Sequence, residues 1–217
     1  MDLLQFARGP GLQWSLGILL FGVAWRLTGI LLLLRRKDFS APRSHAMAWG
    51  ALRTVVTRSW PRKEFHRRGI YGDVLGYIFH IGLAVVVFGF VPHILLIRDL
   101  TGLSWPGLPN GVIYFAGGIT LATLIAVLIR RLTHPVLRLL SNFDDYAAWL
   151  VTALPVASGL AAFAHLGARY ETTLAVHILS AELLLIWLPF GKLTHAYLFA
   201  RSRGTPGAIF PRRGAGT

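Results

Sequence analysis

Residues 74–97 read VLGYIFHIGLAVVVFGFVPHILLI, a run that contains no Asp, Glu, Lys or Arg. About 20 predominantly apolar residues in an α-helix are enough to cross the hydrocarbon core of a bilayer, so this run is long enough to span a membrane. Two histidines, His80 and His93, interrupt the apolar pattern. Because polar side chains inside a membrane are costly unless they bind or pair with something, the run predicts a transmembrane helix with a function.

Further apolar segments of comparable length lie on both sides of this run. We therefore predict an all-α membrane protein, a bundle of five transmembrane helices that forms one domain over residues 1–217. The fifth predicted helix is long and contains Pro189. The five predicted helices cover about residues 12–34, 72–97, 111–129, 146–165 and 172–200.

The charged residues predict an orientation for this bundle. Apolar residues make up 54% of the chain and charged residues only 14%, and the net charge is +13. Most of the 22 Lys and Arg residues lie on one side of the predicted membrane, chiefly in a basic loop at 35–69 and a tail at 201–217. The positive-inside rule puts these segments in the cytoplasm and the N-terminus outside. This distribution argues against a nucleic-acid partner, which the net charge alone would suggest.

Part of the basic loop carries apolar residues at helical spacing. Within residues 41–60, the side chains of Trp49, Leu52, Val55, Val56 and Trp60 fit a roughly helical stripe. One interpretation is a helix that lies on the membrane surface. The alternatives are a solvated basic loop held by anionic lipid and a docking surface for a soluble partner. We rank contact with lipid first and partner docking second.

Cysteine is absent from the chain, whereas there are eight histidines. The absence excludes disulfides, thiolate zinc sites and cysteine-ligated iron–sulfur clusters within this chain. Any bound metal must therefore be held mainly by histidine.

Four histidines fall inside predicted membrane helices, two on the second helix and two on the fifth. His177 and His195 are 18 residues apart, which in an unbroken helix is five whole turns and about 27 Å along one face. By depth in the membrane, His80 pairs with His195 near the cytoplasm, and His93 pairs with His177 near the outer surface. Two neutral imidazoles from facing helices are the ligands of a bis-histidine haem iron. A single membrane histidine is more often structural, but four that pair by depth favour the haem interpretation.

Short motifs in the same order and spacing resemble a known family. They are PFGKLTH at residues 189–195, FHIG at 79–82, FAGG at 115–118, and RRL followed by a proline at 130–135. The chain resembles the gamma subunit of respiratory nitrate reductase, a dihaem cytochrome b that anchors that enzyme. It is also similar to cytochrome b subunits of sulfite-reductase-associated and heterodisulfide-reductase-like membrane complexes. The likeness extends from Trp25 to His195.

This resemblance also implies which histidines bind each haem. It implies that His80 and His195 bind the haem nearer the cytoplasm and that His177 is one ligand of the outer haem. The family's other outer ligand lies 10 residues after the first ligand of that helix, a position that Phe90 occupies here. His93 lies about one turn further on and can serve if the helix shifts or kinks at Pro92. Otherwise the outer haem is lost and His177 is structural or part of a quinone site.

Other polar residues of the predicted spans are candidates for the same chemistry. Glu182 can exchange a proton during quinol oxidation, or it can be a protonated carboxyl bonded to a neighbouring helix. His165 can line an outer quinone site or be an ordinary interfacial histidine. Arg26 and Lys192 can pair with haem propionates or extend to the interface. His45 lies in a loop and is expected to have no chemical role.

The resemblance predicts a haem b membrane subunit of a respiratory complex in the cytoplasmic membrane of a prokaryote. Such a subunit transfers electrons between membrane quinol and cytoplasmic-side iron–sulfur and catalytic subunits. One alternative is a monohaem anchor with only the His80 and His195 pair filled. The other is a membrane anchor or proton-relay protein without a cofactor. The sequence does not identify the terminal substrate, because that chemistry belongs to other subunits.

Overall fold

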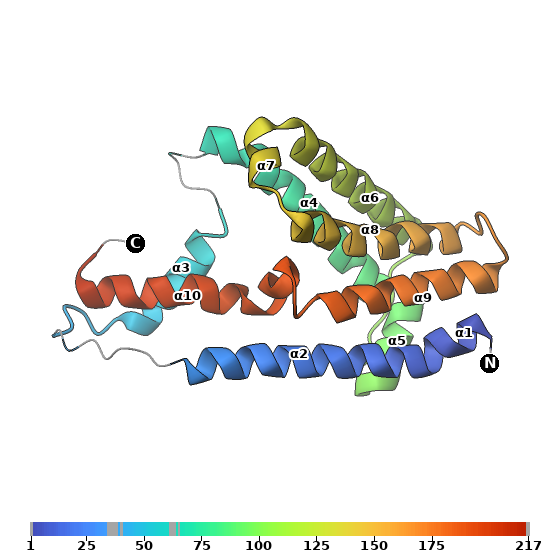
Figure 1. Ribbon diagram of the computed structural model, residues 1–217, viewed down its shortest axis with the longest axis horizontal. Helices are drawn as coiled ribbons and strands as arrows, with labels where there is room; N and C mark the ends of the chain where they lie inside the picture. Colours follow the sequence, from blue (N-terminus) through green and yellow to red (C-terminus); the bar gives the residue numbers. More distant parts are fainter. Residues whose placement is uncertain (1, 34–38, 40, 61–63, 65, 216–217) are drawn as a thin grey trace. The chain divides into compact units, whose positions relative to one another are not determined.

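The computed structural model describes residues 2–33, 39, 41–60, 64 and 66–215, and every regular element in these residues is a helix (Figure 1). The described residues contain four helical stretches that are long and apolar enough to cross a membrane. They are Leu3–Leu32, Gly69–Gly89, Asn110–Thr133 and Phe143–Phe163. A broken pair, Tyr170–Trp187 with Lys192–Arg213, makes a fifth when it is counted as one span. The predicted all-helical membrane class is thus confirmed, while the orientation and the exact number of spans stay predictions.

The residues fall into two compact units. The first unit comprises residues 1–19 and 74–187, and the second comprises residues 20–73 and 188–217. The single domain expected from the sequence stays a prediction. The predicted end of the first span at Leu34 and parts of the basic loop at 35–69 lie outside the described residues.

The first unit contains the N-terminal helical stretch and most of the apolar helices. It begins with α1 (Leu3–Phe6), a π-helical turn η1 (Ala7–Gly11) and the start of α2 (Leu12–Leu32). It continues through most of α4 (His66–Gly89), then α5 (Val91–Thr101), α6 (Asn110–Thr133), α7 (Pro135–Leu140), α8 (Phe143–Phe163) and α9 (Tyr170–Trp187). Helix α8 packs against α6 and α9, and α1 and η1 pack against α9 (Figure 1).

Small side chains fill the interior of this unit, and large apolar side chains face outward. Where α4 approaches α6, a Cβ added at Gly82 would collide with the Thr120 hydroxyl and lie 3.3 Å from the Ala116 carbonyl oxygen. A Cβ added at Gly117 of α6 would lie 2.9 Å from Leu160 Cδ2 of α8. Many Leu, Phe and Trp side chains are exposed. Such packing is typical of membrane helices, in which small residues bring backbones together and lipid solvates the outer surface.

The second predicted span is not one continuous helix. Helix α4 ends at Gly89 and α5 begins at Val91, with Phe90 between them in an extended conformation at φ −81° and ψ 124°. Pro92 stands at the start of α5, where its missing N–H costs no helical hydrogen bond. The predicted helix over residues 72–97 is therefore divided at Phe90, two residues before Pro92.

The third and fourth spans are close to their predicted positions. Helix α8 begins with a capping box in which Asn142 accepts from the Asp145 N–H and the Asp145 carboxylate accepts from the Asn142 N–H. Asp145 also forms an ion pair with Arg131 of α6, with Nη1 and Oδ1 3.0 Å apart. Asp145 therefore helps to cap the N-terminus of α8.

The fifth predicted span, 172–200, is wrong as a single helix. Helix α9 ends at Trp187, and a short 3-10 turn η3 (Lys192–Thr194) precedes α10 (His195–Arg213). The break contains Pro189, which cannot donate a helical hydrogen bond, and Gly191, which is extended at φ −100° and ψ −166°. The argument that His177 and His195 share one face over five turns therefore fails. The predicted tail at 201–217 is also largely helical.

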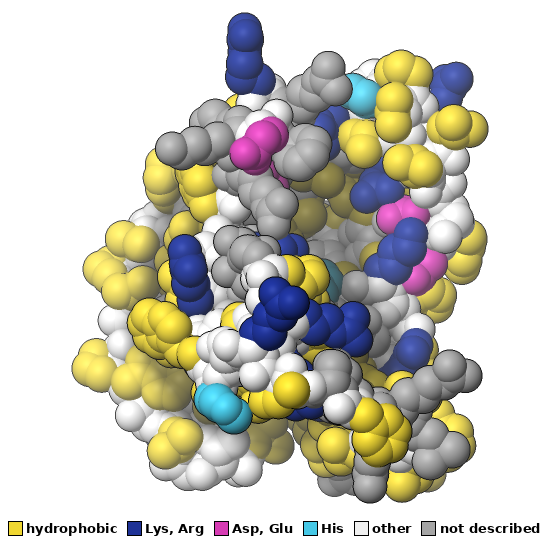
Figure 2. Space-filling model, turned by 90° about the vertical axis from the view of Figure 1, so that its left-hand side faces the viewer, with side chains coloured by type: hydrophobic (Ala, Val, Ile, Leu, Met, Phe, Trp, Pro, Cys, Tyr) yellow, Lys and Arg dark blue, Asp and Glu magenta, His cyan; other side chains and the backbone are white. Residues whose placement is uncertain are grey.

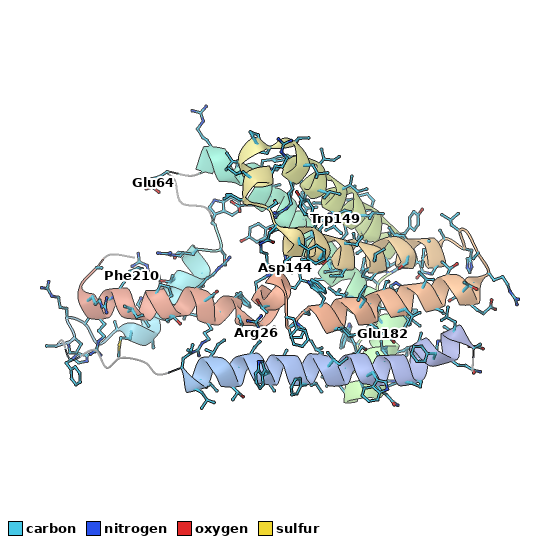
Figure 3. All side chains as sticks on the ribbon, in the orientation of Figure 1. Arg26, Glu64, Asp144, Trp149, Glu182 and Phe210 are labelled. Carbon is cyan, nitrogen blue, oxygen red and sulfur yellow. The ribbon has the colours of Figure 1, made fainter. Side chains whose placement is uncertain are left out.

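The second unit holds the rest of α2, α3 (Met47–Thr57), the start of α4, η3 and α10. Arg26 of α2 donates from Nε to the Pro189 carbonyl oxygen at 3.1 Å and from Nη2 to the Phe190 carbonyl oxygen at 3.0 Å. A break in a helix leaves carbonyls without helical donors. The Arg26 guanidinium thus satisfies two backbone oxygens of the break between α9 and α10 (Figure 3).

Candidate functional site

The imidazole rings of His93 and His177 face each other within the first unit. Their ring centroids are 6.0 Å apart and their planes differ by 24°. His93 comes from the first turn of α5, directly after the break at Phe90, and His177 comes from the middle of α9. The break at Phe90 and the packing of the helices therefore bring together the rings of one of the two pairs that depth predicted.

Both rings are oriented by backbone carbonyls. His93 Nδ1 lies 3.0 Å from the Val86 carbonyl oxygen, and His177 Nδ1 lies 3.0 Å from the Pro155 carbonyl oxygen. A carbonyl can only accept, so each Nδ1 carries the proton and each Nε2 keeps its lone pair. This is the arrangement of most metal-binding histidines, whose second nitrogen is held by a carbonyl or a carboxylate.

Helix α8 supplies the space in which the His177 ring lies. The His177 ring approaches the Pro155 carbonyl over Gly159, where an added Cβ would lie 2.9 Å from His177 Cε1 and 3.0 Å from Nδ1. Ser158 lies beside the ring, with Oγ 3.5 Å from Nδ1. Any side chain at Gly159 would displace the imidazole.

The pair lies in apolar surroundings. The Phe90 ring contacts two other rings edge-on. Its centroid lies 5.2 Å from that of His93 and 5.6 Å from that of Phe163. Both imidazoles are partly buried. Phe90 occupies the position at which the resembled family has its outer ligand on this helix. Its ring packs against His93, the histidine that lies near His177 in this chain.

The spacing of the two stacked rings can be compared with that of two histidines bound on opposite sides of one metal. A bond from imidazole nitrogen to a metal is about 2 Å long, and the ring centre lies about 1 Å behind the nitrogen, so two ligands of one metal have centres about 6 Å apart. The observed 6.0 Å agrees with this value. Among the described residues, no group of three or more His, Cys, Asp or Glu side chains could hold a metal ion. Two histidines alone suit iron whose other ligands come from a porphyrin.

The two histidines of the predicted inner pair belong to different units, His80 to the first and His195 to the second. Nδ1 of His80 lies 2.6 Å from the Gly76 carbonyl oxygen, and Nδ1 of His195 lies 2.9 Å from the Lys192 carbonyl oxygen. Each ring therefore has the same tautomer as the outer pair, and their pairing stays a prediction.

Glu182 lies on α9, five residues after His177, and is 5% exposed (Figure 3). Its carboxyl packs against Gly11 of η1, where a Cβ would lie 2.7 Å from Oε2 and 3.1 Å from Oε1. Within the described part of the chain, its buried Oε1 has no hydrogen-bond partner. An ionised carboxylate is costly in such a place, so the geometry favours the protonated acid.

The remaining predicted residues lie in other places. His165 follows α8 with a positive φ of 52°, and its ring is 5.1 Å from the Tyr170 ring. Arg26 binds the backbone of the α9–α10 break, and Lys192 begins η3 in the same unit. Contact of Arg26 or Lys192 with a haem propionate stays a prediction, as does a quinone at His165.

Sequence reasoning missed the glycines that shape this site. Gly159 admits the His177 ring and Gly11 admits the Glu182 carboxyl, yet neither belongs to a recognised motif. The π-helical turn that contains Gly11 also contains Pro10, and the Gly-Pro-Gly sequence at 9–11 was the available signal. Turns of this kind are frequent at functional sites.

Comparison with known proteins adds a relative but no activity. No model of a protein family and no solved structure matches the chain. A protein of Nitratidesulfovibrio vulgaris (strain Hildenborough) is 33% identical over 223 residues, which covers 98% of this chain and 96% of that protein. The chain belongs to the same family as this relative. The relative's name is simply "Protein", so the function is argued from the site.

Proposed function

We propose that the chain is a haem b membrane subunit that transfers electrons between membrane quinol and a cytoplasmic-side iron–sulfur partner. The observation that carries this proposal is the His93–His177 pair, with ring centres 6.0 Å apart and each Nδ1 bound to a backbone carbonyl. A haem held between two imidazoles supplies one-electron transfer without a site for substrate on its iron. The resemblance to nitrate reductase gamma subunits points the same way.

The chain's own residues have three tasks in this proposal. His93 and His177 present their Nε2 lone pairs, and the Val86 and Pro155 carbonyls hold the rings in that tautomer. The apolar side chains around them exclude water and keep the site at low dielectric. Glu182 exchanges a proton, since oxidation of one quinol to quinone releases two electrons and two protons.

The proposed orientation follows from the basic segments. The loop at 35–69 and the end of the chain face the cytoplasm, and the N-terminus faces outside. The His93–His177 pair then lies nearer the outer surface, and His80 and His195 hold a second haem nearer the cytoplasm. The chain lacks cysteine, so the clusters that accept its electrons belong to partner subunits.

A cofactor-free anchor is the main competing function. In such a protein the two rings would be packing residues, and their Nε2 atoms would need polar partners or water. A monohaem anchor is the other competitor, in which only His80 and His195 bind iron. The approach of His93 to His177 favours the dihaem form over both.

Haem content tests the proposal directly. We expect the detergent-purified chain to contain two b haems per polypeptide, measured by pyridine haemochrome spectra against the protein concentration. Reduced-minus-oxidised spectra should show both haems, and a quinol analogue should reduce them. One haem would support the monohaem anchor, and a folded, haem-supplied preparation without haem would exclude the electron-transfer function.

The Glu182→Gln substitution is expected to keep both haems and to slow their reduction by quinol. The amide has nearly the same shape beside Gly11 but cannot exchange a proton. Loss of a group that transfers protons typically slows a reaction by about 10²-fold or more, so the stopped-flow rate of haem reduction should fall by that order. Glu171→Gln, at the exposed start of the same helix, is the control. An unchanged rate in Glu182→Gln would assign Glu182 a structural role only.

A further inference from the structure

Helix α3 is fixed to α10 along one face by small residues. A Cβ at Gly50 would collide with the Gly207 carbonyl oxygen, and a Cβ at Gly207 would collide with the Thr54 hydroxyl. One turn earlier on α10, a Cβ at Gly204 would lie 3.7 Å from the Ala51 Cβ. The two backbones therefore touch, and α3 and α10 form one close-packed helix pair within the second unit.

The opposite face of α3 is apolar and exposed. Trp49, Leu52 and Val56 are 66%, 56% and 64% exposed, and Trp60, just beyond the helix, is 53% exposed. At 100° per residue these positions point away from Gly50 and Thr54, which face α10. The helix thus has a small-residue face inside the pair and an aromatic face outside it.

Positive charges predominate in the segment that carries this face, which lies between Asp38 and Glu64. Residues 39–63 contain Arg43, Arg53, Arg58, Arg62 and Lys63 and no Asp or Glu. Residues 192–217, which include α10, likewise contain Lys and Arg but no Asp or Glu. Figure 2 shows Lys and Arg side chains gathered among hydrophobic ones on the face of the molecule turned toward the viewer.

We infer that the α3–α10 pair is a membrane-surface module whose aromatic face, Trp49, Leu52 and Val56, inserts into the headgroup region of an anionic lipid leaflet. Tryptophan and arginine are the side chains that favour this region, the first by its amphipathic ring and the second by attraction to lipid phosphate. The chain also enters and leaves this segment through apolar helices, α2 before it and α4 after it. Lipid is therefore always within reach, whereas a soluble partner must bind from solution.

This inference does not depend on the proposed haem chemistry. It assigns to the basic loop a role that the haem ligands neither need nor imply. It also assigns different surroundings to the two outer faces of the helix pair. The α3 face enters lipid, and the exposed polar residues Ser202 and Thr205 of α10 remain in water.

The test uses spin labels on the full-length chain, which has no cysteine of its own. Val56→Cys and Leu52→Cys place a label on the aromatic face, and Ser202→Cys places one on α10 as the matched control. Each variant is reconstituted into vesicles of phosphatidylcholine with phosphatidylglycerol, or of phosphatidylcholine alone. Electron paramagnetic resonance then measures collision of the label with oxygen, which partitions into lipid, and with a water-soluble nickel chelate.

In the anionic vesicles, we expect the ratio of oxygen to nickel collisions to be severalfold higher at Val56 and Leu52 than at Ser202. The ratio at Val56 should fall when phosphatidylglycerol is omitted, because the arginines lose their partners. Equal water exposure of all three labels in both kinds of vesicle would overturn the inference and leave the aromatic face to a protein partner. Two label positions on the face guard against one variant that fails to fold.

Discussion

The His177→Ala substitution is expected to lower the haem content of the purified chain from two b haems to one. The imidazole of His177 faces that of His93 across 6.0 Å, and neither the backbone nor Ser158 can replace its nitrogen as an iron ligand. A haem left with one histidine ligand in a membrane site loses most of its affinity. His93→Ala should have the same effect, because the two rings act as one site.

Two further variants accompany this experiment, one as a control and one with an intermediate effect. His45→Ala removes an exposed loop histidine and should leave two haems. Gly159→Ala keeps both ligands but places a Cβ 2.9 Å from the His177 ring, so the ring must shift and the outer haem should be bound more weakly. We expect partial occupancy and a changed midpoint potential for one haem only, measured by redox titration of the α-band.

Full haem content in both His93→Ala and His177→Ala would contradict the assignment of the outer pair. Loss of one haem in His177→Ala alone would mean that another residue, not His93, completes the site. If both haems are lost, size-exclusion chromatography of the same sample shows whether the protein has unfolded.

Depth in the membrane predicted that His93 lies near His177, and the two rings are 6.0 Å apart, while their binding of haem stays a prediction. His93 and His177 match in depth, and Pro92 gave a reason for the helix to bend just before His93. A proline near the start of a helical segment acts locally, so its effect can be predicted without knowledge of the neighbouring helices. The geometry of this half of the site was therefore within reach of sequence reasoning.

The fifth span shows where such reasoning fails. Pro189 predicts a local disturbance, but a proline alone often only kinks a helix. Here the chain breaks, with Gly191 extended, and Arg26 from a distant part of the sequence donates to the carbonyls of Pro189 and Phe190. That compensation comes from a residue 163 positions away from Pro189 and leaves no local pattern. The sequence predicted that Arg26 contacts haem propionates or extends to the interface, which stays a prediction, and it gave no sign of this backbone contact.

Contacts between helices were likewise beyond prediction. The niche that Gly11 provides for Glu182, and the space that Gly159 provides for His177, depend on which helix faces which. In a membrane bundle, hydrophobicity does not distinguish the inner face of a helix from the lipid face, because both are apolar. Small residues are the remaining signal, and they indicate a close approach without naming the partner.

The Gly82→Leu substitution should prevent the chain from folding, because Gly82 lies against Thr120 and Ala116 of α6. Even a Cβ at this position would collide with the Thr120 hydroxyl, and Thr120 is fully buried and donates to the Ala116 carbonyl. The larger side chain must therefore push the two helices apart. Overpacking of an interior typically costs about 1–3 kcal/mol, and here a backbone oxygen as well as a side chain stands in the way. Gly82→Ala, with a smaller clash, should fold with a lowered thermal unfolding temperature.

The matched control is Gly118→Leu on α6, where nothing lies within 4 Å of an added Cβ. This side chain points outward, and a leucine there should be as acceptable to lipid as its neighbours. Yield of monodisperse protein and its thermal unfolding in the same detergent measure both variants. If Gly82→Leu matched Gly118→Leu, α4 and α6 could not be packed as the structure has them. If both variants failed, Gly118 would lie against protein rather than lipid. Failure of Gly82→Leu alone would mean that helix contact, and not apolar burial in general, holds His80 and its neighbours on α4 in place.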